Sequence, residues 1–299
     1  MAVIVFVLLV FALILSVECR LVLFHPFKTV YYLVTDIYRY FHDHKYDRYD
    51  GGMLNCYFAH FGGGKTLSVV HYVRILFKRY NNKRIYDRQR KKWVLQKIHI
   101  ISNVQLKGIP FEELVSLSQV VCCAWRNKKI DEEHDTRTCV IVLLDEASSE
   151  LNSRNFKSNI DANFLNTLIT SRHFNMSLYY TSQKFKLVDA LLRSVTQRCI
   201  WCDKRWRFMV QHFFDSDEME YASNPTLIQP LLRKGFFITD ADYNTYDTLA
   251  TVERLDKSTK EGDMMTEEEI LTLRGAINPD NDSVTKPSRK LKRIRKRGA

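Results

Sequence analysis

The sequence predicts an α/β fold in which helices cover both faces of a mostly parallel central sheet, giving three layers. A continuous apolar run, Cys139–Leu144, has the pattern of a central strand that is buried on both faces. The segments at 53–58 and 176–183 also read as strands, and segments with helical spacing of apolar residues lie between them. Strands that alternate with helices are typical of parallel sheets.

A glycine-rich loop follows the first of these strands. Met53–Thr66 fits the phosphate-binding P-loop pattern G-x-x-x-x-G-K-[S/T], with Ala59 where the first glycine usually lies. Glycines allow consecutive backbone N–H groups to point inward, and a helix at 67–78 would add its positive N-terminal end. The pattern predicts that Lys65 reaches the β- and γ-phosphates of ATP and that the Thr66 hydroxyl binds Mg²⁺. The residues expected to bind the nucleotide are Ala59, His60, Phe61, Gly62, Gly63, Gly64, Lys65 and Thr66.

Two acids, Asp145 and Glu146, follow the apolar run that ends at Leu144. Ligands of open α/β sheets bind at the carboxyl ends of the strands, which is where these acids would lie. We expect Asp145 to hold Mg²⁺, through water, and Glu146 to act as the general base that polarises the attacking water. A strand that ends in a charged turn is the alternative, and the P-loop about 80 residues earlier disfavours it.

Two further polar residues flank the strand expected at 176–183. Gln183 ends this strand and is expected to sense the γ-phosphate from beside the acid-bearing strand. Arg172 precedes the strand and fits either an arginine finger, acting in its own subunit or a neighbouring one, or a surface arginine paired with an acid.

The amino-terminal region begins with a run of 16 uncharged residues, Ala2–Val17, all apolar except Ser16. This run is slightly short for a membrane span, but flanking residues can extend it. A cleaved signal peptide would carry a basic residue before the run and small residues at the cleavage site, and the sequence has neither pattern. We therefore expect an uncleaved single-pass anchor at 1–25. Basic residues follow the run, which predicts that the rest of the chain is cytoplasmic.

Composition divides the remainder of the chain. The aromatic-rich juxtamembrane segment, 26–50, fits either an interfacial helix beside the membrane or an ordinary amphipathic helix. The P-loop ATPase domain is expected at 51–255, followed by a polar linker and a basic, disordered tail at 256–299. Within it, Lys286–Arg297 holds eight basic residues and no acid, out of a net charge of +11 for the whole chain, so the tail could bind DNA or acidic lipid, or aid solubility.

The segments between 78 and 138 and a C-x-x-C sequence near residue 200 carry weaker patterns. The basic stretch at 78–97 reads as a nucleic-acid surface or a solvated loop, and 97–103 reads as a strand. We expect a helix at 110–120 and a charged loop at 125–138. The C-x-x-C of Cys199–Cys202 lies on an expected strand, where positions three apart point to opposite faces, so we expect neither a zinc nor a redox site there.

Taken in order, these motifs resemble the zonular occludens toxin-like family, which includes the filamentous-phage assembly ATPases. That family is similar to the FtsK/HerA class of DNA-pumping P-loop ATPases. The resemblance covers about residues 50–250 and is carried by the P-loop, Ile101–Asn103, Leu143–Ala147, Ser171–Asn175, Thr181–Gln183 and Tyr246–Thr248.

The resemblance implies a viral or prophage protein that uses ATP to extrude or package phage DNA at the host inner membrane. It implies a homo-oligomeric ring, a single-stranded phage genome as substrate, and phage coat and assembly proteins as partners. The family usually places its ATPase domain before the membrane span, whereas here the apolar run comes first. Two alternatives stay open: an ATPase that packages DNA into a preformed capsid, and a non-catalytic, membrane-tethered scaffold that binds nucleic acid. The nucleotide roles of the family would fall on Lys65, Thr66, Asp145, Glu146 and Gln183.

Overall fold

A computed structural model of the chain describes residues 5, 17–147, 169–222 and 227–246. The chain divides into two compact units. The first combines residues 1–48 with 84–94, and the second combines 49–83 with 95–299. The expected tail at 256–299 and most of the apolar run at 2–17 lie outside the described residues.

The first unit is built from helices and the tip of a β-hairpin. Its elements are α2 (Val17–Phe24), α3 (Pro26–His42), the 3₁₀ helix η1 (Lys45–Asp47) and the adjoining parts of β2 (Lys83–Asp87) and β3 (Lys92–Ser102). The helix α3 confirms that the aromatic-rich segment is helical. In the described part of the chain, no helix combines the length and the apolar character that a membrane span requires.

The second unit contains the central sheet and the helices on its two faces. Its helices are α4 (Lys65–Tyr80), α5 (Leu117–Glu133), η2 (Ser171–Phe174), η3 (Phe185–Leu187), α8 (Ala190–Val195), α9 (Ser216–Tyr221) and α10 (Asp240–Tyr243). Its strands, besides β3, are β1 (Leu54–Phe58), β4 (Glu112–Glu113), β5 (Thr136–Leu144), β6 (Met176–Ser182), β7 (Arg198–Arg205), β8 (Phe208–Asp215) and β9 (Leu232–Phe237).

The sheet is mostly parallel, as the sequence predicts. Its strands follow the order β2-β3-β5-β6-β1-β7-β8-β9, and the short β4 pairs with β3. The run from β3 through β7 is parallel, whereas β7, β8 and β9 pair antiparallel. Because β6 lies between β1 and β5, its carboxyl end separates the loop that follows β1 from the acids that follow β5.

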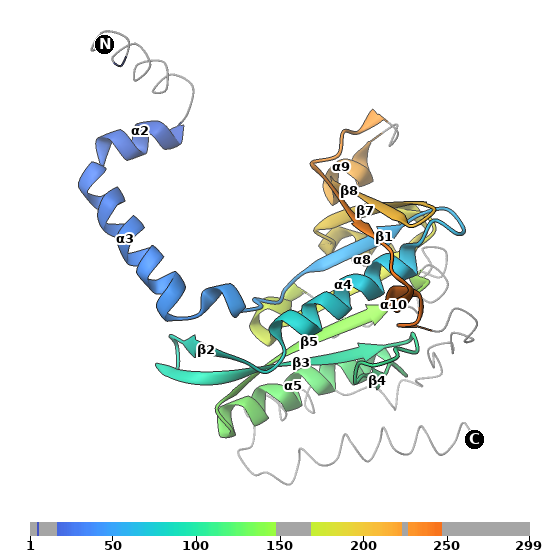
Figure 1. The fold of residues 1–299 in the computed structure, drawn as a ribbon, viewed down its shortest axis with the longest axis horizontal. Helices are drawn as coiled ribbons and strands as arrows, with labels where there is room; N and C mark the ends of the chain where they lie inside the picture. The colour runs from blue at the N-terminus through green and yellow to red at the C-terminus, as the bar shows by residue number, and fades with distance from the viewer. Residues whose placement is uncertain (1–4, 6–16, 148–168, 223–226, 247–299) are drawn as a thin grey trace. The chain divides into compact units, whose positions relative to one another are not determined.

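The apolar core has two parts, one on each face of the sheet. Helix α4 lies on one face of the sheet and α5 on the other (Figure 1), which gives the expected three layers. Strand β5 contributes to both parts, because alternate residues of a strand point to opposite faces. Its residues Cys139, Ile141 and Leu143 pack on the α4 side, and Val140, Val142 and Leu144 on the α5 side.

Three local expectations are wrong. The stretch at 78–97 is not a loop, because β2 and the first half of β3 occupy most of it, and β3 buries alternate residues such as Val94 and Gln96. The helix expected at 110–120 starts only at Leu117, where Ser116 caps it by accepting a hydrogen bond from the Gln119 backbone N–H (3.3 Å). The same helix, α5, then continues to Glu133 through most of the segment expected to be a charged loop.

The two cysteines of the C-x-x-C sequence lie on opposite faces of the sheet, as expected for positions three apart on a strand. Cys199 packs in the core on the α5 side of the sheet, and Cys202 packs in the core on the α4 side. Both side chains are buried and both cysteines are free. The two thiols therefore point away from each other and do not form a shared site.

Candidate active site

The P-loop leaves the sheet from β1, whose five residues are all buried. Gly62 and Gly64 have positive backbone angles (φ 74° and 79°), which glycine adopts without the steric cost that other residues incur. The Gly63 backbone N–H donates to the His60 carbonyl at 3.0 Å, which closes the loop. The sequence pattern of three consecutive glycines thus reflects a tightly curled backbone.

Ala59, the departure from the usual pattern, is accommodated by Gly63. Ala59 is fully buried, and a Cβ added to Gly63 would lie 2.7 Å from its Cβ. A Cβ added to Gly64 would lie 2.4 Å from the Met209 methyl carbon. The methyl group at 59 therefore occupies space that the missing side chain at 63 leaves open.

Helix α4 begins at Lys65, immediately after the loop. Its N-cap residue is Gly64, which has no side chain with which to cap the helix. The first N–H groups of a helix lack intrahelical partners and carry positive partial charge. This N-terminus is thus suited to an anion such as a phosphate group.

Asp145 lies next to this helix N-terminus. The Thr66 hydroxyl donates to both carboxylate oxygens of Asp145, at 3.0 and 3.1 Å. The Thr181 hydroxyl, from β6, donates to Oδ1 of the same carboxylate at 2.5 Å. The structure therefore brings together the two residues that the sequence assigns to Mg²⁺, and it adds Thr181 as their neighbour.

Burial governs the ionisation of Asp145. Loss of solvent raises the pKa of its carboxyl above the ordinary value, and this effect exceeds the opposing effects of the Thr181 and Thr66 hydrogen bonds and the Lys65 charge. A bound divalent cation would favour the ionised carboxylate. A bound cation would therefore offset the free-energy cost of keeping the buried Asp145 carboxylate ionised.

Glu146 pairs with the P-loop lysine. Its Oε1 lies 3.1 Å from Lys65 Nζ, while its backbone N–H donates to the Thr181 hydroxyl at 2.9 Å. Glu146 also has a left-handed backbone (φ 53°), a conformation that costs free energy for a residue with a side chain and is frequent at functional sites. The strained turn directs the side chain toward the P-loop.

Asn103 fixes the turn from the other side. It follows β3, and its side-chain amide donates to the Asp145 carbonyl (3.0 Å) and accepts from the Asp145 backbone N–H (2.7 Å). Reasoning from sequence gave no role to Asn103 or Thr181 beyond their place in the family motifs. For Asn103 the local signal is a polar residue directly after a strand, whereas Thr181 lies within β6 and has no such signal.

Gln183 and Arg172 occupy different edges of the sheet. Gln183 directly follows Ser182, which pairs with Phe58 at the end of β1, so Gln183 lies at the same edge as the P-loop. The backbone of Arg172 belongs to η2, before the start of β6, and therefore lies at the opposite edge. Six residue steps of β6 separate the two edges by roughly 20 Å, so an arginine finger at 172 would have to act in a neighbouring subunit. The Arg172 side chain falls outside the described part of the chain.

The assembled residues fit a nucleotide with Mg²⁺. A helix N-terminus and an ammonium group lie where phosphates would bind, and a threonine hydroxyl and a carboxylate lie beside them. Hydroxyl and carboxylate oxygens are ligands that Mg²⁺ prefers, directly or through water.

No protein-family model and no curated protein matches the chain. Among solved structures, the N-terminal domain of zonular occludens toxin from Neisseria meningitidis is 16% identical, with a TM-score of 0.41 over 65% of this chain and 98% of that one. The first of these neighbours thus belongs to the family that the sequence motifs resemble.

Two further neighbours are ATPases or NTPases by name. The genome packaging NTPase B204 of Sulfolobus turreted icosahedral virus 2, in complex with AMPPCP, is 10% identical, with a TM-score of 0.38 over 64% of this chain and 98% of that one. EssC (ATPases 2 and 3) from Geobacillus thermodenitrificans is 11% identical, with a TM-score of 0.37 over 83% of this chain and 44% of that one. All three TM-scores are below 0.5.

Proposed function

We propose that this chain is a P-loop ATPase. The observation that carries the proposal is the meeting of four side chains from two distant motifs. Lys65 lies 3.1 Å from Glu146, and the Thr66 hydroxyl lies 3.0 Å from Asp145, at the carboxyl edge of a parallel sheet. Neither motif alone predicts that these four side chains meet. A single site that uses both motifs requires it.

Each residue has a separable role in ATP hydrolysis. The loop N–H groups and Lys65 bind the phosphates, and Thr66 with Asp145 would hold Mg²⁺, which neutralises phosphate charge when it is bound. Glu146 is the base that orients and polarises the attacking water. Because Glu146 now pairs with Lys65, that ion pair must open for the lysine to reach the phosphates. Gln183 lies at the same edge and would sense the γ-phosphate.

The task that hydrolysis drives is proposed from the family motifs. We infer that the ATPase moves phage DNA, with extrusion of a single-stranded genome preferred over packaging into a capsid. The proposed assembly is a homo-oligomeric ring at the host inner membrane, anchored through residues 1–25 and working with phage coat and assembly proteins. A basic tail supports contact with a polyanion.

The test is ATP hydrolysis by the full chain, with and without single-stranded DNA, alongside Lys65→Ala and Glu146→Gln. Lys65→Ala should lose ATP binding and turnover together. Glu146→Gln should bind ATP at least as tightly as the parent chain, because it frees Lys65, but should not turn it over. Stimulation by single-stranded DNA would support the DNA-moving task.

The control is Glu133→Gln, a charge change of the same kind at the end of α5, which should leave turnover unchanged. Failure of the parent chain to bind ATP would refute the ATPase proposal and leave the scaffold. ATP turnover that is unaffected by single-stranded or double-stranded DNA would refute the DNA-moving task alone.

A further inference from the structure

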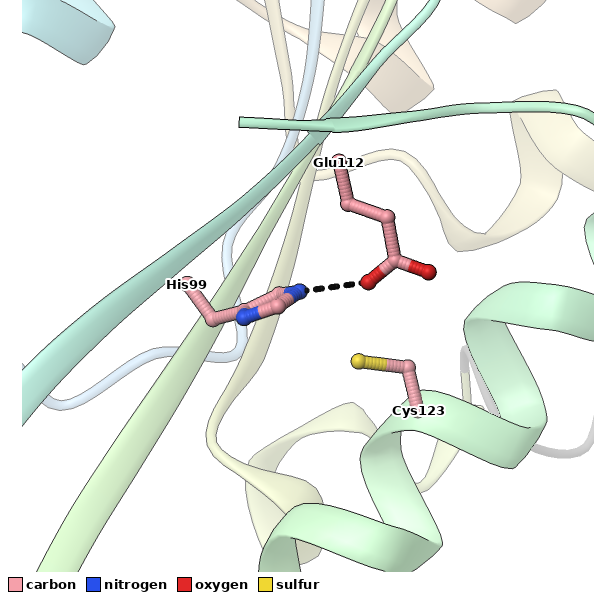
Figure 2. Close-up of side chains that lie close together, drawn as sticks. All are labelled: His99, Glu112 and Cys123. Carbon is pink, nitrogen blue, oxygen red and sulfur yellow. Dashed lines mark hydrogen bonds and ion pairs between the residues drawn. The ribbon is translucent and has the colours of Figure 1, made fainter. Parts of the chain in front are cut away.

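A histidine, a glutamate and a cysteine converge on the face of the sheet opposite the P-loop helix. His99 projects from β3, Glu112 from β4 and Cys123 from α5, and their side chains point toward one another (Figure 2). One potential ligand atom of each lies within 4.8 Å of the other two. Within the part of the chain that the structure describes, this is the one group of three such side chains.

We propose that His99, Glu112 and Cys123 bind a zinc ion. An imidazole nitrogen, a carboxylate oxygen and a thiolate are the three ligand types that Zn²⁺ uses in proteins. Bond lengths of about 2.0 to 2.3 Å in a tetrahedral site place ligand atoms roughly 3.5 Å apart. The ligand atoms, which lie within 4.8 Å of one another, would therefore need to shift by about an ångström to bind the metal.

The neighbours of the three side chains already orient them as ligands. Gln119 Nε2 donates to Glu112 Oε1 at 2.7 Å, while the other oxygen, Oε2, faces His99 Nε2 at 2.9 Å. Asn127 Nδ2 donates to the Cys123 sulfur at 3.3 Å, which restricts the orientation of that side chain. Outer partners of this kind fix ligand orientation and contribute to metal affinity.

The three ligands differ in solvent exposure, and this leaves the fourth coordination position of the metal open to water. The Cys123 side chain is buried, whereas the side chains of His99 and Glu112 keep about a third of their surface exposed (32% and 35%). Water can therefore supply the fourth ligand. Arg126 approaches Glu112 at 3.8 Å, but its side chain is 56% exposed and can turn away when a cation binds.

The proposed zinc ion would cross-link β3, β4 and α5. Strand β4 has two residues and pairs with β3 only at Ile101 and Ser102. The metal would join β4 and α5 to β3, four residues before Asn103. We therefore expect zinc to stabilise the fold, with its effect measured separately from ATP binding.

The test is metal binding by the full chain after treatment with a chelator. Zn²⁺ should bind at one ion per chain in competition with a chromophoric chelator, and Co²⁺ should give the absorption of a tetrahedral thiolate complex. Cys123→Ser and Glu112→Gln should weaken zinc binding by more than the roughly 10- to 100-fold that loss of an outer partner causes. Gln119→Ala should fall within that smaller range.

Cys122→Ser is the matched control, because Cys122 is adjacent on the same helix but is not one of the three ligands. It should bind zinc like the parent chain. Less than one ion per chain, or equal affinity in the parent chain and Cys123→Ser, would overturn the proposal and leave a hydrogen-bonded His–Glu pair beside a thiol. Lys65→Ala should keep zinc binding, so failure of the ATPase proposal would not be mistaken for failure of this one.

Discussion

Asn103 and Asp145 hold each other through two reciprocal hydrogen bonds. The Asn103 side chain accepts from the Asp145 backbone N–H at 2.7 Å and donates to the Asp145 carbonyl at 3.0 Å. The two residues follow adjacent parallel strands, β3 and β5. This contact fixes the backbone that carries the proposed Mg²⁺ ligand Asp145 and the proposed base Glu146, without touching either carboxylate.

Asn103→Ala should therefore lower turnover more than it lowers ATP affinity. Lys65 and the loop amides stay in place, whereas the turn at Asp145 and Glu146 loses its support. A displacement of about 1 Å at a catalytic group can cost about a hundredfold in rate, so we expect a fall in kcat of that order. The measurement is steady-state ATP hydrolysis together with equilibrium binding of a fluorescent ATP analogue.

Asn81→Ala provides the comparison for that experiment. Like Asn103, Asn81 supports the backbone of another segment through its side chain. It accepts a hydrogen bond from the Ile98 backbone N–H in β3 at 3.0 Å. Asn81 is the C-cap of α4, at the end of that helix opposite to the P-loop and Thr66. Its loss should reduce stability by about 1 to 3 kcal/mol and leave kcat nearly unchanged. Equal losses of kcat in both variants would contradict a positioning role for Asn103.

Thr181→Val should raise the Mg²⁺ concentration that ATP hydrolysis requires. Valine keeps the shape of threonine but loses the hydroxyl that donates to Asp145 and accepts from the Glu146 N–H. Loss of such an outer partner typically weakens a metal site by about 10- to 100-fold. The readout is the half-saturating Mg²⁺ concentration at saturating ATP.

Thr196→Val is the corresponding control. Thr196 is also a buried threonine, and its hydroxyl hydrogen-bonds Tyr180 at 2.6 Å, away from Asp145. It should leave the Mg²⁺ requirement as it is. An unchanged requirement in Thr181→Val would show that Thr181 does not support the metal ligand.

Asp145→Asn should stabilise the Mg²⁺-free chain while abolishing hydrolysis. The pKa of Asp145 is raised in the folded chain, mainly by burial, so its ionised form is less favourable in the folded than in the unfolded state. This destabilisation is absent below the ordinary pKa of 3.8 and grows until the pH exceeds the folded pKa. The variant should therefore melt at a higher temperature than the parent near pH 7, with the difference shrinking toward pH 4.

Asp242→Asn should give the opposite sign. Burial tends to raise the pKa of Asp242, but hydrogen bonds from Thr239 and His71 outweigh it and lower the pKa overall. Arg74 also donates to Asp242 at 2.8 Å. Loss of this carboxylate should lower the melting temperature near neutral pH, with the difference again smaller in acid. Both melts are recorded with a chelator present, and destabilisation by Asp145→Asn would contradict the burial argument.

The sequence predicted the parts of the site that local patterns encode. The P-loop, Asp145 and Glu146 each follow a strand whose apolar run is visible in the sequence, and the sheet places their strands parallel as expected. Gln183 also lies at the expected edge. Arg172 could be assigned to a strand end from sequence, but only the parallel pairing of β6 with β1 shows that its backbone lies at the far edge.

Other features depend on strand order, which sequence does not reveal. Asn103 reaches Asp145 only because β3 and β5 are neighbours, and His99, Glu112 and Cys123 are brought together by three separate elements. The helix expected at 110–120 starts instead at Leu117, because the Ser116 cap sets its first turn. No strand was expected at 208–215, where β8 lies. Most of its residues are half-buried, so the segment lacks the regular alternation of apolar and polar residues that predicts a strand.

The contact between Ala59 and Gly63 leads to a prediction about the unusual P-loop. Gly63→Ala would place a methyl group 2.7 Å from the Ala59 Cβ and should weaken ATP binding by at least tenfold, about 1.4 kcal/mol. The double variant Ala59→Gly/Gly63→Ala removes that clash and should recover part of the affinity. Recovery should be incomplete, because the new methyl group still lies 3.1 Å from the His60 carbonyl oxygen.

Gly62→Ala distinguishes this clash from general intolerance of the loop. Gly62 has a positive φ of 74°, but a Cβ there meets nothing within 4 Å, so its substitution causes backbone strain without a clash. Ala59→Gly should therefore fail to rescue Gly62→Ala while it rescues Gly63→Ala. A double-mutant cycle on ATP affinity should give a coupling of about 0.5 to 3 kcal/mol between 59 and 63, because contacting residues are not additive. A coupling near zero would mean that Ala59 is tolerated for a reason other than the missing side chain at 63.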